Sequence, residues 1–264
     1  MKQLFDDVFN AQRIYETLFF NVKAVLTHPT LSGLEKENKV MFERWKHLSK
    51  NKYGLTEKDM NDIEYMQETY EKNAPYYPEF TKIVTITYAT VYVENGSLKR
   101  YMKKIVNDDE FIVLVTFMDE LSRISSEGSQ STPNFFPILC GHNIISYDIP
   151  LLIKKFIYYR DRFETNNKIP LILKKSLSIK PWESGIVDTV NVWKFNGFDN
   201  MPLMLISDYL DLKRTTDLLS LDKLSKEYWK LRADDNEKAI EFVSLQSATQ
   251  TNLVIQLMNT LRVL

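Results

Sequence analysis

The sequence predicts an α/β fold, in which a mixed sheet of antiparallel and parallel strands is flanked by helices. Two observations predict it. Extended runs rich in β-branched and aromatic residues, at 82–93 and 97–106, are joined by Asn95-Gly96, a pair typical of a tight hairpin turn. After this hairpin, short apolar runs alternate with amphipathic helical patterns, which is typical of parallel strands with helices packed on the faces of the sheet.

The segments before the hairpin are a strand and several helical stretches. Residues 4–16 predict a short helix, and residues 17–25, TLFFNVKAV, predict an apolar strand. From about 34 to 72 the pattern is helical and highly charged. We expect two apolar stripes of this segment to face a core, one made by Met41, Trp45 and Leu48 and the other by Ile63, Met66 and Tyr70.

The segments after the hairpin alternate between helix and strand. Asp108 opens a helical stretch that runs to 124, because acids are favoured at a helix N-terminus. FPILC, at 136–140, predicts a strand, and GIVDTV, at 185–190, predicts a short extended segment. Further helices are expected at 147–163, 191–195 and 236–261, the last with apolar positions at Ile240, Phe242, Leu253 and Leu257.

Composition and charge are those of an ordinary globular protein. The chain has 264 residues, of which 44% are hydrophobic and 26% charged. We see no repeat or long linker, and we expect a single domain over 1–264 with a helical insertion at about 34–72. The formal charge is −1, from 34 Lys and Arg against 35 Asp and Glu, so any nucleic-acid contact must come from a local basic patch.

The sequence also predicts where the protein works. Its one cysteine, Cys140, cannot form an intramolecular disulfide and closes an apolar run, which indicates a buried residue and a reducing compartment. The N-terminal residues carry acids, and no apolar stretch approaches the roughly 18 residues that span a bilayer. We therefore expect a soluble, intracellular, cytoplasmic protein with no membrane partner.

Four segments resemble one family. GHNIISYDIPLL, at 141–152, resembles the second motif of the DEDD-type 3′-5′ exonucleases, in which Gly-His-Asn ends a strand and an Asp begins the next helix. The other three segments, at 76–88, 180–195 and 224–229, resemble a subgroup of predicted exonucleases related to the proofreading domain of family B DNA polymerases. The resemblance covers nearly the whole chain and implies a ribonuclease-H-like domain.

The resemblance also implies a degenerate active site. In this family four carboxylates hold two divalent metals, which stabilise the attacking and leaving oxygens of phosphodiester hydrolysis. Here LFFNVKAV, at 18–25, puts Asn21 at the first acid position, Lys23 at the second and Ala24 at the following Thr. On the last helix Phe242 matches the Tyr and Gln246 the Asp, and a shift of two residues would put Ala248 there instead.

Of the four expected acids only Asp148 remains, so we expect neither a metal nor another cofactor, unless one Mg²⁺ or Mn²⁺ binds weakly at Asp148. Two interpretations of Asp148 stay open: its carboxylate pairs with the Lys23 ammonium, or it caps the helix that it opens. Asn21 and Gln246 would add hydrogen bonds to the Lys23–Asp148 pair. We expect Asp188 to be structural and His142 and Asn143 to fix a turn.

A second group of candidate residues lies around a basic segment. Residues 154–180 contain eight basic residues and two acids, with Tyr158, Tyr159 and Phe163 interleaved. Such a segment could follow a single nucleic-acid strand by phosphate contact and base stacking, or it could be a solvated helix face followed by a basic loop. The candidate nucleic-acid-binding residues are His142, Asn143, Tyr147, Lys154, Lys155, Tyr158, Arg160, Arg162, Lys174 and Lys175.

Two functions follow from these observations. In the first, the chain is a pseudo-exonuclease that serves as a nucleic-acid-binding or protein-docking accessory module in replication, repair or viral assembly. In the second, it is a divergent but active metal-dependent 3′-5′ exonuclease. The three missing carboxylates favour the first function. The expected partners are single-stranded DNA or RNA, or a protein.

Overall fold

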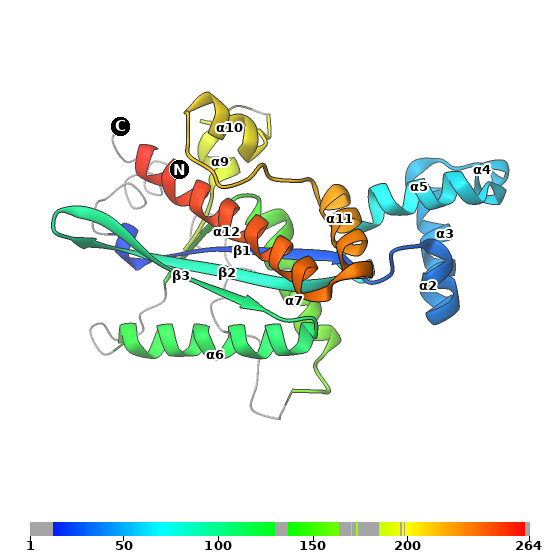
Figure 1. Cartoon of the computed structure of the whole chain (residues 1–264), viewed down its shortest axis with the longest axis horizontal. Coiled ribbons are helices and arrows are strands. Elements are labelled where there is room, and N and C mark those ends of the chain that lie inside the picture. Colours follow the sequence, from blue (N-terminus) through cyan, green and yellow to red (C-terminus); the bar gives the residue numbers. More distant parts are fainter. Residues whose placement is uncertain are drawn as a thin grey trace. The chain divides into compact units, whose positions relative to one another are not determined.

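A five-stranded sheet organises the chain, as seen in a computed structural model that describes residues 13–129, 137–163, 170, 173, 185–195, 197 and 199–261 (Figure 1). The strand order is β3-β2-β1-β4-β5. β2 pairs with β3 antiparallel, whereas β4 pairs with both β1 and β5 in parallel. The predicted mixed sheet is therefore confirmed. The strands are β1 (Thr17–Leu26), β2 (Thr81–Glu94), β3 (Ser97–Val106), β4 (Ile138–Gly141) and β5 (Ile186–Asp188).

Helices make up most of the remaining described chain. Before the hairpin they are η1 (Arg13–Glu16), α2 (Leu31–Glu37), α3 (Lys39–Tyr53), α4 (Glu57–Asn61), α5 (Ile63–Asn73), η2 (Ala74–Tyr76) and η3 (Pro78–Phe80). After it they are α6 (Glu110–Ser129), the π-helical turn η4 (Ile144–Asp148), α7 (Ile149–Tyr158), α9 (Thr189–Trp193), α10 (Leu203–Tyr209), α11 (Leu221–Asp234) and α12 (Asn236–Leu261).

The chain divides into two compact units. Unit 1 comprises Met1–Lys23, Thr85–Leu218 and Ser244–Leu264, and unit 2 comprises Ala24–Val84 and Leu219–Val243. The single domain expected over 1–264 stays a prediction, and the predicted insertion at 34–72 lies within unit 2. No helix in the described part of the chain is long and apolar enough to cross a membrane.

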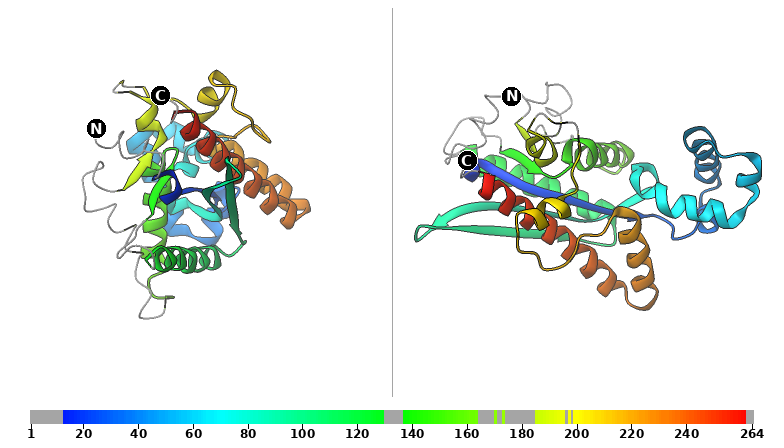
Figure 2. Two further views of the ribbon diagram at one scale, coloured as in Figure 1. Left: turned by 90° about the vertical axis from the view of Figure 1, so that its left-hand side faces the viewer. Right: turned by 90° about the horizontal axis from the view of Figure 1, so that it is seen from above.

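In unit 1, successive side chains of β1 point to opposite faces of the sheet, as a strand requires. Phe19 belongs to a core that it shares with Leu253 and Leu257 of α12. Its neighbour Phe20 stacks on Phe117 of α6, with ring centroids 6.3 Å apart. Helices therefore cover both faces of the sheet, and Figure 2 shows α6 and α12 on opposite sides of the strands.

The hairpin of β2 and β3 is confirmed. Asn95 and Gly96 have φ angles of 52° and 74°, the left-handed conformations that a two-residue hairpin turn of type I′ needs. The ladder runs in register from Thr85 opposite Val106 to Glu94 opposite Ser97. α12 also occupies the range predicted for it, Asn236–Leu261.

In unit 2, an aromatic cluster forms the core of the helical insertion. Trp45 is fully buried, and its ring lies 5.3 Å from that of Phe80 and 5.5 Å from that of Tyr70, both edge-on. The chain enters and leaves this segment at one point, because the Thr27 N–H donates to the Phe80 carbonyl at 2.9 Å.

Several expectations about helices need correction. The prediction that Ile63 faces a core is wrong: it is 85% exposed, because α5 begins there. Met41 and Leu48 are only partly buried, whereas Met66 and Tyr70 are buried. The helix predicted at 147–163 is shorter, since α7 runs from Ile149 to Tyr158 after a π-helical turn. α10 and α11 were not predicted, and most of the helix predicted at 4–16 lies outside the described residues.

Candidate functional site

The candidate site begins on β1. Asn21 and Lys23 are two residues apart on a strand, so their side chains leave the same face of the sheet. Both are buried, with exposed fractions of 2% and 5%. A polar amide and an ammonium inside a sheet core require partners, because an unpaired buried polar group costs about 1–3 kcal/mol and a charge costs more.

The turn after β4 brings Asp148 to β1. Asn143 adopts a left-handed conformation, with φ at 65°, and the π-helical turn η4 then leads to Asp148. The carboxylate Oδ1 accepts from the backbone N–H of Val22 at 2.5 Å and from the side-chain amide of Asn21 at 3.2 Å. Asp148 thereby fastens the start of α7 to the middle of β1.

Neither interpretation of Asp148 from the sequence is the contact that forms. Lys23 and Asp148 are both described, and no hydrogen bond or ion pair joins them, because the Lys23 ammonium donates to Gln250 Oε1 at 2.5 Å. The Asp148 carboxylate bonds to β1 and does not cap the described first turn of α7. The expected direct ion pair and the expected cap are therefore both wrong.

The charges of Lys23 and Asp148 still interact without contact. Burial raises the pKa of Asp148 to about 7, and the Val22 N–H and the positive charge of Lys23 oppose that rise. Burial lowers the pKa of Lys23 to about 8, while the negative charge of Asp148 works in the opposite direction. Near neutral pH this buried pair has lost part of its charge.

α12 completes the site with residues that the sequence reasoning missed. Ser247 Oγ donates to Asn21 Oδ1 at 3.1 Å, and Gln250 accepts from Lys23. The signal was present in the helix periodicity: Ser247 lies on the buried stripe of Val243 and Val254, four residues after one and seven before the other.

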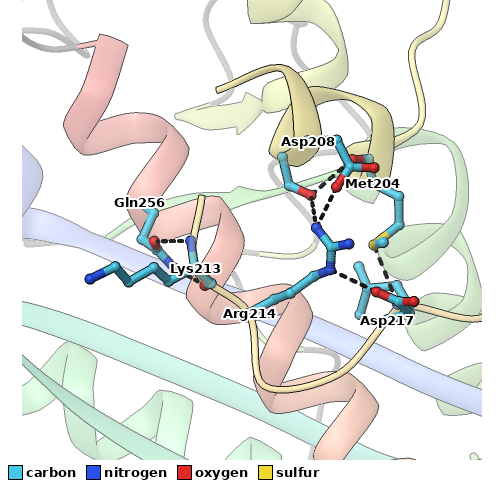
Figure 3. Close-up of polar contacts among 8 residues, drawn as sticks. Met204, Asp208, Lys213, Arg214, Asp217 and Gln256 are labelled. Carbon is cyan, nitrogen blue, oxygen red and sulfur yellow. Dashed lines mark hydrogen bonds and ion pairs between the residues drawn. The ribbon is translucent and has the colours of Figure 1, made fainter. Parts of the chain in front are cut away.

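Gln246, the residue predicted from the resemblance, has another role. Its side-chain amide donates to the Asp217 carbonyl at 2.8 Å. Asp217 belongs to the loop between α10 and α11, which other contacts also hold (Figure 3). The side-chain amide of Gln256 on α12 makes two hydrogen bonds with the backbone of Lys213. Arg214 of the same loop bonds Asp208 on α10. Gln246 therefore helps to fasten a loop, while Ser247 contacts Asn21.

Two further polar side chains, those of Asp188 and His142, make hydrogen bonds at this turn, and the structural roles expected for them stay a prediction. Asp188 accepts from the backbone N–H groups of Asn143 at 2.8 Å, Ile145 at 3.0 Å and Val190 at 3.0 Å. His142 Nδ1 lies 2.9 Å from Thr189 Oγ1. Burial lowers the pKa of His142 to about 4, so its imidazole is neutral at pH 7.

The residues present do not fit a two-metal centre. Among the described residues, no three or more His, Cys, Asp or Glu side chains are grouped so that they could hold a metal ion. Beside Asp148 the site offers an amide and a hydroxyl, and an ammonium lies where the second acid is expected. Hard divalent ions require several oxygen ligands with negative charge, and this set provides one.

The basic segment is partly engaged in its own structure. Lys155 is buried and pairs with Glu110 at 3.2 Å, so its predicted phosphate contact is wrong. Arg162 lies over the Phe111 ring at 4.0 Å. Arg160 pairs with Asp161 at 3.4 Å, Lys154 is exposed, and Tyr158 is 72% exposed. Tyr147 is half-buried and Asn143 exposed, while Lys174 and Lys175 lie outside the described residues.

No protein-family model, no curated protein and no solved structure matches the chain.

Proposed function

We propose that this chain is a noncatalytic protein of the DEDD exonuclease type, which serves as a nucleic-acid-binding or protein-docking accessory module in replication, repair or viral assembly. The proposal joins the four segments that resemble the family to the contacts around Asp148. Its active-site region is a closed, hydrogen-bonded part of the core.

The observation that carries the proposal is the set of partners of Asp148. β1, the turn after β4 and α12 bring Asn21, Asp148 and Ser247 together, and the resemblance places acids of the metal site on these three segments. The one acid in the group already accepts two hydrogen bonds, and the Lys23 ammonium is buried beside it. A phosphodiester and two metal ions would have to displace this network.

The loss of catalysis is also supported by electrostatics. A positive charge at Lys23 repels a divalent cation, and this repulsion is strong in a partly dry site, where the effective dielectric constant is below that of water. The carboxylate of Asp148 offers little compensation, because burial raises its pKa to about 7 and part of the population is neutral.

The proposal is tested with end-labelled single-stranded DNA and RNA, an excess of protein and Mn²⁺, in parallel with Asp148→Ala. We expect a mobility shift without cleavage. Cleavage that disappears in Asp148→Ala would establish a metal-dependent exonuclease and overturn the proposal. A protein that neither shifts nor cleaves the strands would retain only the protein-docking role.

A further inference from the structure

Charge is segregated along the helices of unit 2. α3 carries five Lys and Arg residues against one acid, Glu43. The segment 57–71, which contains α4 and most of α5, carries six acids against one lysine. Unit 2 therefore has one strongly cationic helix, although the whole chain has a formal charge of −1.

A surface groove runs along this cationic helix. Four Lys and Arg residues of α3 line it together with one acid, and its apolar side chains are Val40 and Met60. The other lining residues are Lys39, Glu43, Arg44, Lys46, His47 and Lys50. Lys39 and Lys50 are eleven residues apart, so the cations extend over roughly 16 Å of helix at about 1.5 Å per residue. That length spans several phosphates of a nucleic-acid strand, which follow one another at about 3.4 Å of axial rise.

The cations of the groove are available to a ligand. Lys39, Arg44 and Lys50 are exposed, and none of the described acids pairs with them. Lys46 approaches Glu43 only at 3.9 Å. On α11, by contrast, Lys226 and Lys230 each have an acid nearby, Glu71 at 3.8 Å and Glu227 at 3.4 Å.

We propose that the α3 groove binds the sugar-phosphate backbone of a nucleic acid without reading its sequence. This inference rests on the proposed function and names the surface that the binding module would use. Charge complementarity selects the ligand: unpaired Lys and Arg side chains spaced along one helix fit a regular polyanion. An acidic amphipathic peptide fits less well, because it needs a row of apolar pockets and the groove offers only Val40 and Met60.

The test measures binding of short fluorescent single-stranded and double-stranded DNA by anisotropy, over a series of salt concentrations. One variant, Lys39→Gln with Arg44→Gln and Lys50→Gln, removes three cations from the groove. The matched control, Lys223→Gln with Lys226→Gln and Lys230→Gln, removes three exposed cations from α11 in the same unit. Circular dichroism checks that both variants remain folded.

We expect the groove variant to bind roughly 10- to 100-fold more weakly near 0.1 M salt, with a salt slope shallower by about 2–3, because each phosphate contact contributes about 0.9 to that slope. The α11 control should bind like the wild type. Lys39→Arg with Lys50→Arg, which keeps the charges, should also retain binding.

Several results would overturn the inference. Equal binding by the wild type and the groove variant would place the contact elsewhere and leave the proposed function standing. Equal losses in the two triple variants would show a general charge effect. Competition by polyglutamate as strong as that by unlabelled DNA would identify a site for acidic chains. Cleavage of the DNA with Mn²⁺ would overturn the proposed function alone, since the variants would still report on the groove.

Discussion

Asp148 is the residue on which the interpretation of the site depends. Its carboxylate accepts from the backbone of β1 and from Asn21, and it lies in the field of the buried Lys23. Hydrogen bonds to a charged group contribute about 1.5–3 kcal/mol, which does not offset the cost of burying this acid, because its pKa still rises to about 7. Asp148 therefore links the start of α7 to β1, and its carboxyl group has a raised pKa.

That titration predicts a pH dependence of stability. The folded protein holds the Asp148 proton up to about pH 7, whereas the unfolded chain releases it near the ordinary value of 3.8. Between these values the folded state binds more protons, so the free energy of unfolding falls as pH rises. Asp148→Asn should remove this decline and keep both hydrogen bonds, as urea unfolding of the two proteins from about pH 4 to pH 7 will show.

The difference between wild type and Asp148→Asn isolates this one group from His142, which titrates in the same range with the opposite sign. Lys23 adds a second expectation: its pKa is lowered from 10.5 to about 8, so it makes stability rise with pH between those values. If the free energies of unfolding of the wild type and of Asp148→Asn change in parallel between about pH 4 and pH 7, Asp148 titrates normally.

The last residue of β4, Gly141, is packed too closely against its neighbours to carry a side chain. A Cβ at this position would lie 2.7 Å from the Phe20 carbonyl oxygen of β1 and 2.2 Å from Ile144 Cγ2. Gly141→Ala should therefore lower the free energy of unfolding by about 1–3 kcal/mol, the usual cost of overpacking. Urea unfolding measures this loss. Gly54→Ala is the comparison, since a Cβ there meets nothing within 4 Å and only its left-handed φ of 68° adds cost.

At the scale of elements, the register of α12 decides which of its residues contacts Asn21. Ser247 contacts Asn21, and Gln246 contacts the Asp217 carbonyl. A triple variant with Asn21→Asp, Lys23→Glu and Ser247→Asp should therefore bring three new carboxylates next to Asp148, which makes four in total. We expect this variant to be less stable without metal and to gain about 2.7 kcal/mol when free Mn²⁺ is about 100 times its Kd.

The control for this experiment carries Gln246→Asp in place of Ser247→Asp. It has the same net charge, but its new acid lies where Gln246 bonds the loop at Asp217. Thermal unfolding with and without Mn²⁺ compares the two variants. A larger Mn²⁺ stabilisation in the Gln246→Asp variant would contradict the register seen here.

Elements with strong local signals were predictable from the sequence. Asn95-Gly96 between two β-branched runs gave the hairpin, and the sustained periodicity from Asn236 to Leu261 gave α12 with its bounds. The break-up of the segment 34–72 into separate helices depends on caps such as the Thr56 side chain, which bonds the N–H of Asp59, and the left-handed Gly54. Such signals lie in single residues, which a stripe of apolar positions does not reveal.

The candidate site was predictable only in part. Asn21, Lys23 and Asp148 come together because a strand and a turn place them by local geometry. Ser247 and Gln250 were missed because a helix turns about 100° per residue, so an error of one position moves the side chain to another face. The partner of Lys23 could not be predicted either, since its long side chain reaches Gln250 instead of Asp148.

At the scale of the whole molecule, the helical insertion has a buried core of its own within unit 2, although α11 contacts α5 and η2. Trp45, Met66 and Tyr70 share a core cluster with Leu26 and Phe80. A second cluster of unit 2, which includes Val25, Val84 and Tyr228, contains no residue from 28–79. The hydrogen bond from Thr27 to Phe80 holds the two ends of the insertion together.

A chain without residues 28–79, closed by a short Gly-Asn-Gly turn, should therefore still fold. We expect cooperative urea unfolding at reduced stability, because Leu26 and Phe80 lose their packing partners. We also expect this protein to lose the salt-dependent DNA binding assigned to α3. A molten chain without a cooperative transition would show that the second cluster of unit 2 depends on the insertion.

Cys140 has a practical consequence for studying the native protein. It is the one cysteine of the chain, fully buried on β4 with Phe19 and Val187 as its neighbours across the strands, and burial raises its pKa well above the usual value. A thiol reagent can reach it only when the sheet opens around β4. The rate at which Cys140 of the wild-type protein is labelled therefore measures how often the sheet opens around β4. No cysteine has to be introduced for this measurement.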